Sequence, residues 1–241
     1  MAETLVWISG ASSGIGRALA DTVPFDDARV IDISRSGAPG LEHVAADLSQ
    51  VSGWQAAAES FAKELASFQG ERAVFVHCAA TLTPIGFSGE EDPAGYAQQV
   101  LLNSASPQIL GDAFIRAVDD RDLDSHLLIL TSGAATSVYE GWSAYGAGKA
   151  AVEQWVRIVG AERARRGSRC RIVAVAPGVV ETPMQEQIRE TPEEEFPAVG
   201  KFIDRHESGE LVPPEEAARG IWALLDRDLE NGAVVDLREL D

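Results

Sequence analysis

The chain has few cysteines and few basic residues, and each shortage excludes a class of protein. Its 241 residues include two cysteines, Cys78 and Cys170, both in apolar runs and far from any Cys-x-x-Cys or Cys/His spacing. We therefore expect buried free thiols, with neither a disulfide nor a metal site. The chain has 20 basic side chains and 38 acidic ones, a formal charge of -18. Because this charge would repel nucleic acid and anionic membrane surfaces, we expect neither as a partner.

Long hydrophobic runs are also missing. No stretch reaches the roughly eighteen apolar residues of a membrane helix, and the first residues lack the basic and apolar segments of a secretory signal. We therefore expect a cytoplasmic protein. Hydrophobic residues make up 45% of the chain, enough for one sizeable core, and no internal repeat or low-complexity linker divides it. We predict a single domain over residues 1–241.

Short apolar runs typical of strands alternate with longer helical patterns. The runs lie at residues 4–9, 29–34, 73–78, 126–132, 171–176 and 233–237. The helical patterns lie at about 14–23, 51–67, 104–118, 143–166 and 214–227. Continuous apolar strands separated by helices indicate a parallel sheet covered on both faces. The predicted fold class is therefore α/β, with a doubly wound parallel sheet of the Rossmann type.

Residues 181–213 depart from this alternation. The segment contains four prolines and three successive glutamates, and its periodicity is weak. A long irregular connection at this point predicts a lid over a substrate site.

A glycine-rich turn, SGASSGIG at residues 9–16, follows an apolar strand and opens a helix. Gly10, Gly14 and Gly16 would allow a tight turn, close backbone approach to a pyrophosphate and exposure of helix N-terminal amides to it. A simple strand-to-helix turn is the alternative. The spacing is G-x3-G-x-G, which differs from the commonest dinucleotide fingerprint.

A second pattern, SAYGAGKAAVEQWV at residues 143–156, places Tyr145 four residues before Lys149. On a helix such residues are neighbours, so the ammonium can favour the ionised phenol. By spacing alone, a solvated contact is the simpler interpretation.

Five motifs in this order resemble the short-chain dehydrogenase/reductase family. They are SGASSGIG, LLNSASP (101–107), LILTSGAA (128–135), YGAGK (145–149) and PGVVETPM (177–184). Within the family the chain is most similar to the sepiapterin reductase and benzil reductase branch. The segments that carry this likeness are TLTPIG (81–86), EGWSAYGAGKAA (140–151) and the ending GAVVDL.

The resemblance implies four catalytic residues. Tyr145 would be the general acid that protonates the carbonyl oxygen, and Lys149 would lower the pKa of its phenol and hold the nicotinamide ribose. Ser132 would hydrogen-bond the substrate oxygen and polarise the carbonyl. Asn103 would hold a water that relays protons to the lysine.

The resemblance also implies a nicotinamide dinucleotide, and we expect NADP(H). Ser34 stands where NAD-dependent relatives have an aspartate, and the next residue, Arg35, suits a 2′-phosphate. Many NADP enzymes also have a basic residue where this chain has Ser13. Arg17 either compensates or is an ordinary exposed helical arginine. The expected cofactor-binding residues are Gly10, Ser12, Ser13, Gly14, Ile15, Gly16, Ser34, Arg35, Asp47, Leu48, Ala79, Tyr145, Lys149, Pro177, Gly178, Val180 and Thr182.

Two features depart from the family pattern. HCAA, residues 77–80, replaces the usual Asn-Asn-Ala-Gly. His77 either hydrogen-bonds in place of the asparagine or lies neutral in the core, and we favour a structural role over a catalytic one. The ending GAVVDLREL replaces Asp-Gly-Gly, which argues against a tetramer formed through that edge. A homodimer through helices 104–118 and 143–166 is the remaining expectation.

The predicted function is NADP-dependent carbonyl reduction, in which a small uncharged ketone or diketone becomes an alcohol. Residues 181–215 carry ten carboxylates and three basic side chains, so they would oppose anionic ligands unless they form only a solvated loop. Trp142 and Tyr139 either pack at the start of the helix or line an apolar pocket. An alcohol dehydrogenase working in the oxidising direction and a non-catalytic dinucleotide-binding sensor are the alternatives.

Overall fold

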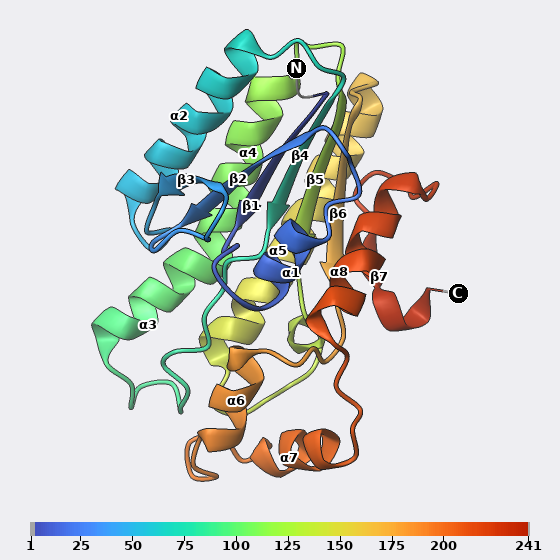
Figure 1. The fold of residues 1–241 in the computed structure, drawn as a ribbon. Coiled ribbons are helices and arrows are strands. Elements are labelled where there is room, and N and C mark those ends of the chain that lie inside the picture. The colour runs from blue at the N-terminus through green and yellow to red at the C-terminus, as the bar shows by residue number, and fades with distance from the viewer. Residues whose placement is uncertain (1–2, 241) are drawn as a thin grey trace.

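A sheet of seven parallel strands runs through the middle of the molecule, in the order β3-β2-β1-β4-β5-β6-β7 (Figure 1). The computed structural model describes residues 3–240, so residues 1, 2 and 241 of the predicted domain lie outside it. The strands are β1 (Thr4–Ser9), β2 (Ala28–Ser34), β3 (Glu42–Ala45), β4 (Arg72–His77), β5 (Asp124–Leu130), β6 (Cys170–Ala176) and β7 (Val234–Asp236). The predicted doubly wound α/β class is confirmed.

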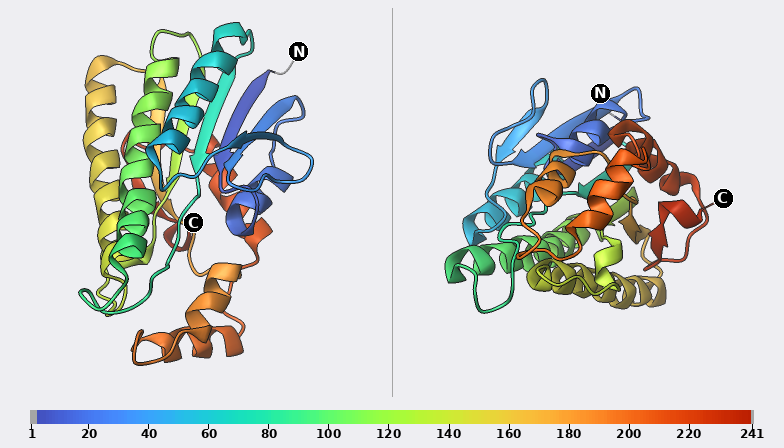
Figure 2. Two further views of the ribbon diagram at one scale, coloured as in Figure 1. Left: turned by 90° about the vertical axis from the view of Figure 1, so that its left-hand side faces the viewer. Right: turned by 90° about the horizontal axis from the view of Figure 1, so that it is seen from below.

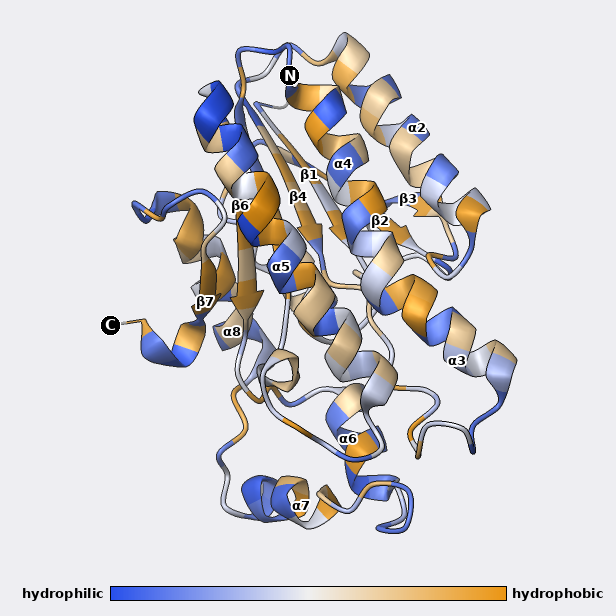
Figure 3. Ribbon diagram, turned by 180° about the vertical axis from the view of Figure 1, so that it is seen from behind, coloured by the Kyte–Doolittle hydropathy of each residue, from blue (hydrophilic) through white to orange (hydrophobic). Residues whose placement is uncertain are grey.

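Helices cover both faces of this sheet, with α2, α4 and α5 on one face and α1 and α8 on the other (Figures 1 and 2). The α-helices are α1 (Gly14–Asp21), α2 (Val51–Ser67), α3 (Pro93–Val100), α4 (Ser106–Val118), α5 (Ser143–Arg166), α6 (Pro183–Glu190), α7 (Val199–Glu207) and α8 (Pro214–Ala223). Short 3-10 turns lie at Gly133–Ala135, Leu224–Asp226 and Leu237–Glu239. Apolar strands between amphipathic helices give the pattern of Figure 3, because each helix buries only its apolar side.

Aromatic side chains form much of the core beneath α2 and α4. Trp7 of β1 packs edge-on against Phe61 of α2, with ring centroids 5.3 Å apart, and Phe61 packs against Phe114 of α4 at 5.5 Å. The buried indole Nε1 of Trp7 donates to Ser60 Oγ at 3.1 Å. This packing fixes the distance between helices and sheet, and with it the strand ends that carry the site.

Strand β3 and helix α3 are among the elements absent from the sequence prediction. Strand β3 pairs with the edge of β2, and because its side chains are mostly exposed, it has no apolar run to reveal it. Helix α3 begins after Asp92, whose carboxylate accepts from the Gly95 N–H at 2.7 Å. A π-helical turn at Leu101–Ala105 then joins α3 to α4. The helix predicted at 104–118 therefore belongs to a longer, bent helical segment.

Residues 181–213 contain α6 and α7, which lie beyond the carboxyl ends of the strands (Figures 1 and 2). A parallel bridge between Val180 and Val212 joins the two ends of this segment. In addition, the Glu181 N–H donates to the Val212 carbonyl at 2.9 Å. The segment therefore begins and ends at one point of the sheet edge.

The sheet order creates a crevice after β1. Strand β1 pairs with β2 on one side and with β4 on the other. The strands that follow β1 in the chain are therefore added first on one side of it, as β2 and β3, and then on the other, from β4 onward. Ligands of open α/β sheets bind at such a switch point, outside the carboxyl ends of the strands. The glycine-rich turn after β1 lies at this position.

Candidate active site

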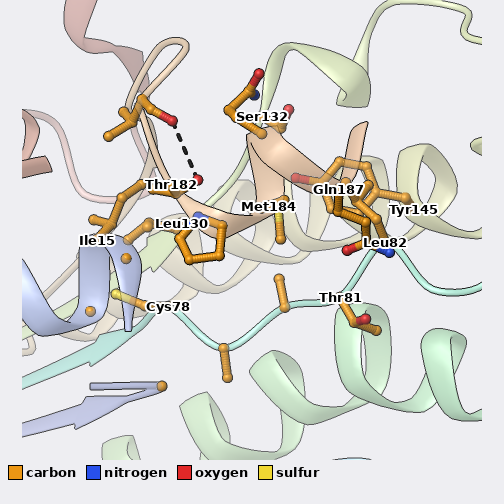
Figure 4. Close-up of a pocket in the computed structure, with 18 of the residues that line it drawn as sticks. Ile15, Cys78, Thr81, Leu82, Leu130, Ser132, Tyr145, Thr182, Met184 and Gln187 are labelled. Atoms are coloured by element: carbon orange, nitrogen blue, oxygen red, sulfur yellow. Dashed lines mark hydrogen bonds between the residues drawn. The ribbon is translucent and has the colours of Figure 1, made fainter. Parts of the chain in front are cut away.

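A cavity of about 890 Å³ opens at the carboxyl ends of the strands and continues under α6 and α7. Figure 4 shows part of its lining, contributed by segments far apart in the sequence, among them Ile15, Cys78, Ser132, Tyr145 and Thr182. Every residue predicted to contact the cofactor lines this cavity, as do Ser132, Tyr145 and Lys149. Of the predicted site residues, Asn103 alone lies behind the wall.

The glycine-rich turn has the shape needed to receive a dinucleotide. Gly14 has φ +53°, and a Cβ at this position would face the Thr182 methyl group at 3.4 Å. A Cβ on Gly16 would lie 2.2 Å from the Gly10 carbonyl oxygen, so no larger residue fits there. The cavity next to this turn is also lined by Ser12 and Ser13, just before α1. Backbone amides at a helix start and hydroxyl donors suit a pyrophosphate, so these residues fit the cofactor.

A buried carboxylate that the sequence analysis missed supports this turn. Asp32 in β2 is fully buried; its Oδ1 accepts from the Ala11 N–H at 3.2 Å, and its Oδ2 accepts from the Ser34 hydroxyl at 2.6 Å. The Gly37 N–H donates in turn to Ser34 Oγ at 3.1 Å. Ser34 therefore forms part of the scaffold of the turn. A lone aspartate within an apolar strand was the available signal, because a buried carboxylate requires hydrogen bonds.

Arg35, just after β2, and Asp47, just after β3, are charged groups that line the cavity. Burial acts to raise the pKa of Asp47, but hydrogen bonds from the Ser49 hydroxyl and N–H and the positive charge of Arg35 bring it below its ordinary value. Arg17 does not line the cavity. Its guanidinium pairs with Asp21 at 2.7 Å, so it is an ordinary helical arginine.

Tyr145 and Lys149 lie on α5 as predicted, but their electrostatic relation differs from the prediction. Burial raises the pKa of Tyr145, and the Ser132 hydroxyl acts in the opposite direction. The Lys149 ammonium donates to the Leu130 carbonyl at 2.8 Å and lies 5.7 Å from the centroid of the Tyr145 ring. Burial lowers the pKa of Lys149 to about 8. The expectation that Lys149 lowers the pKa of Tyr145 is therefore wrong for this arrangement, because Lys149 contacts β5 and burial dominates.

Ser132 lies two residues beyond the end of β5, where the chain turns into a short 3-10 helix. Its Oγ accepts from the Ala134 N–H at 3.2 Å. The prediction placed this serine at the end of a strand running over 126–132, whereas the strand ends at Leu130. Its position beyond the strand end brings the hydroxyl to the cavity near Tyr145.

Asn103 lies within the π-helical turn and is 1% exposed. Its Oδ1 accepts from the Thr81 N–H at 3.0 Å, and its Nδ2 donates to the Thr81 carbonyl at 2.7 Å. A Cβ on Gly148, the residue before Lys149, would lie 3.0 Å from the Asn103 Cβ. Asn103 thus joins the 81–86 loop to α5. The role of Thr81 gave no sequence signal, because it acts through its backbone.

His77 is buried at the end of β4, and its Nε2 lies 3.0 Å from Ser106 Oγ on α4. Burial, together with the charge of Lys149, lowers its pKa to about 3. A neutral imidazole that joins β4 to α4 supports the structural role that we favoured.

The part of the cavity near α6 and α7 is aromatic. Trp142 stacks on Phe196 at a centroid distance of 4.5 Å and packs edge-on against Tyr145 at 5.5 Å. Trp142 and Tyr139 both line the cavity and both pack in an apolar cluster that includes Phe202 of α7. The two interpretations of these aromatic residues therefore hold together.

The charged side chains of residues 181–215 differ in whether they line the cavity. None of its ten carboxylates lines the cavity, whereas Lys201 and Arg205 do. The formal charge of the segment therefore does not describe the charge of the cavity. The acidic total of residues 181–215 therefore gives no reason to exclude anionic ligands from the cavity, because a sum over the sequence ignores which way each side chain faces. The aromatic side chains of the cavity are the remaining reason to expect an uncharged substrate.

Other features of residues 3–240 concern thiols, metals and membranes. Both cysteines are free, but only Cys170 is fully buried, whereas Cys78 is half-buried and lines the cavity. Burial raises the pKa of both thiols. Within these residues no group of three His, Cys, Asp or Glu side chains is arranged to hold a metal ion. No helix among them is long and apolar enough to cross a bilayer.

The sheet, the glycine-rich turn and the Ser-Tyr-Lys cluster define a class of oxidoreductase. Residues 4–193 match the family model described as short chain dehydrogenase, so the chain belongs to the short-chain dehydrogenase family, which uses nicotinamide dinucleotides.

Within this family the chain falls in the predicted benzil reductase and sepiapterin reductase branch. It is 30% identical over 249 residues to an (S)-benzoin-forming benzil reductase of Bacillus cereus, covering 97% of this chain and 99% of that protein. It is 31% identical over 253 residues to a sepiapterin reductase of Mus musculus, covering 95% and 94%. The solved structure of the KRED1-Pglu enzyme superposes with a TM-score of 0.82 at 27% identity, covering 96% of this chain and all of that one.

Proposed function

We propose that this protein is an NADPH-dependent carbonyl reductase that converts a small uncharged ketone or diketone into an alcohol. The observation that carries the proposal is that Ser132, Tyr145 and Lys149 line one cavity, between the glycine-rich turn at residues 9–16 and an aromatic wall. A protein that only bound dinucleotides would not need these three side chains together.

Tyr145 is the proton donor in this proposal. The chemistry that the reduced nicotinamide supplies when bound is a hydride for the carbonyl carbon. Tyr145 gives its proton to the carbonyl oxygen, so that the C=O double bond becomes CH–OH. The raised pKa of the phenol keeps it protonated near neutral pH. Ser132 donates a hydrogen bond to the same oxygen and stabilises its developing negative charge.

Lys149 and Asn103 complete the proton supply. With a pKa of about 8, the Lys149 ammonium can exchange a proton with its surroundings close to neutral pH. In our proposal a water near Asn103 returns the proton that Tyr145 has given away. Lys149 also holds the nicotinamide ribose.

Selection of NADPH rests on Arg35. It lines the cavity at the end of β2, and the carboxylate within that strand, Asp32, is buried and accepts a hydrogen bond from Ser34. A guanidinium at this point can bind the 2′-phosphate with charge-assisted hydrogen bonds.

An aromatic diketone fits the substrate end of the cavity. Residues 181–213 act as a lid in our proposal, with Phe196 and Phe202 of this segment closing over Trp142. The benzil reductase relatives are named for an aromatic diketone. Aromatic walls favour flat apolar molecules by burial and ring packing.

We also propose a cytoplasmic homodimer formed through α4 and α5. Ile109 of α4 is 40% exposed and Ile158 of α5 is 50% exposed. Large apolar side chains exposed on adjacent helices favour burial against a second copy.

The test is steady-state reduction of benzil with NADPH by the wild type and Tyr145→Phe. A positioned general acid contributes about 10²- to 10⁴-fold, so kcat should fall by that factor while NADPH affinity stays within about twofold. Tyr96→Phe is the matched control, because Tyr96 lies outside the cavity and contacts only Ser143 through its hydroxyl. Near-normal turnover by Tyr145→Phe would contradict the proposal.

A further inference from the structure

A second tyrosine–lysine pair lies in the same cavity as Tyr145 and Lys149. The chain has only three tyrosines and three lysines. Tyr139 and Lys201 form this second pair, and both line the cavity. The Lys201 ammonium donates to the Tyr139 hydroxyl oxygen at 3.0 Å and lies 5.2 Å from the centroid of its ring.

The contact with Lys201 leaves the Tyr139 hydroxyl able to donate a hydrogen bond to a ligand. A phenol has one donor and two acceptor lone pairs, and Lys201 uses only an acceptor position. The ammonium withdraws electron density from the oxygen, which makes the remaining O–H a stronger donor. Within residues 3–240 Lys201 has no carboxylate partner, so its charge is not offset there by an ion pair.

Tyr139 belongs to the same wall of the cavity as Tyr145, the proposed proton donor. The rings of Tyr139 and Tyr145 both pack against Trp142, with centroid distances of 5.1 and 5.5 Å. A molecule lying along Trp142 with one oxygen at Tyr145 would extend toward Tyr139. Phe202 packs against both Tyr139 and Trp142, so the aromatic lining continues from Trp142 to Tyr139.

We propose that Tyr139, polarised by Lys201, binds a second oxygen of the substrate, which in a diketone is the carbonyl that is not reduced. The inference rests on the proposed function and adds to it the residues that distinguish dicarbonyl compounds from simple ketones. Tyr139 is a specificity-determining residue, and Lys201 is a positioning residue that acts through it.

The test compares 1-phenylpropane-1,2-dione with propiophenone, which lacks the second carbonyl group. For each enzyme we take the ratio of kcat/KM for the dione to kcat/KM for the monoketone, so that the intrinsic reactivity of the two compounds cancels between enzymes. Loss of a hydrogen bond from a donor polarised by a positive charge should lower this ratio by about tenfold in Tyr139→Phe. Lys201→Met should lower it in the same direction by a smaller factor.

Matched controls are Tyr96→Phe and Lys63→Met, whose side chains lie outside the cavity, and both should keep the wild-type ratio. If the Tyr139–Lys201 bond served only to fasten α7 to the loop before α5, both substrates would suffer equally and the inference would be overturned. Preference for phenylglyoxylate over the dione, abolished in Lys201→Met, would show a carboxylate subsite and would also overturn it. Tyr145→Phe distinguishes the two proposals, because it should stop reduction of both compounds whatever Tyr139 does.

Discussion

Replacing Lys149 by methionine should make the folded protein more stable near neutral pH while removing its activity. Lys149 is 5% exposed, and burial lowers its pKa from the ordinary 10.5 to about 8. At about 1.4 kcal/mol for each pKa unit, the folded state loses roughly 3 kcal/mol by keeping this ammonium charged at neutral pH. Methionine removes that cost. It also leaves the Leu130 carbonyl without its donor at 2.8 Å, which costs about 1 kcal/mol, so the expected net gain is about 2 kcal/mol.

The pH dependence of this difference gives the sharper test. A lysine with a lowered folded-state pKa contributes full stability only above the unfolded value of 10.5, and this contribution is lost as the pH falls to about 8. The advantage of Lys149→Met should therefore be largest below about pH 8 and should shrink as the pH rises toward 10.5. Above about pH 10.5 the lysine is neutral in the unfolded state as well as in the folded one, so burying it no longer costs charge and methionine loses its advantage.

The assay is urea unfolding of the nucleotide-free protein, followed by tryptophan fluorescence, at about pH 7 and about pH 9.5. The control is Lys63→Met, whose side chain is 83% exposed and which should change the free energy of unfolding by less than about 0.5 kcal/mol. A Lys149→Met variant less stable than the wild type at pH 7, or a difference that does not depend on pH, would refute the reasoning.

Other predictions concern stability in acid, the cofactor and the oligomer. His77→Asn should unfold at lower pH than the wild type in an acid titration followed by circular dichroism. In the wild type the pKa of His77 is about 3 in the folded state, so the wild type loses stability as the pH falls below 6.5, by up to about 5 kcal/mol at pH 3. An unchanged midpoint of acid unfolding would argue against a neutral buried imidazole. Arg35→Ala should raise the KM for NADPH by about 10- to 100-fold and leave that for NADH nearly unchanged, and equal effects on both would contradict a 2′-phosphate contact. Ile158→Glu should convert the dimer into a monomer in light scattering after size exclusion, whereas a monomeric wild type would disprove the proposed interface.

Much of the fold could be predicted because its strands are buried on both faces. The apolar run at residues 4–9 became β1 without a change of bounds, and the helix expected at 143–166 is α5 with the same limits. Strand β3 could not be found in this way, since an exposed edge strand needs no apolar residues. The helices α6 and α7 also escaped prediction, because prolines and glutamates obscure the short apolar faces that these helices turn toward the cavity.

Local spacing in the sequence determined which groups could act together, and tertiary packing decided how they are used. The four-residue interval between Tyr145 and Lys149 follows from helix geometry alone, as the tight glycine turn follows from residues that lack a Cβ. Contacts between distant segments were not accessible to such reasoning. Only the folded chain brings Lys149 to the Leu130 carbonyl, and Lys201 to a tyrosine 62 residues away. Only the folded chain turns the carboxylates of residues 181–215 away from the cavity, because the direction of each side chain depends on which face its helix buries.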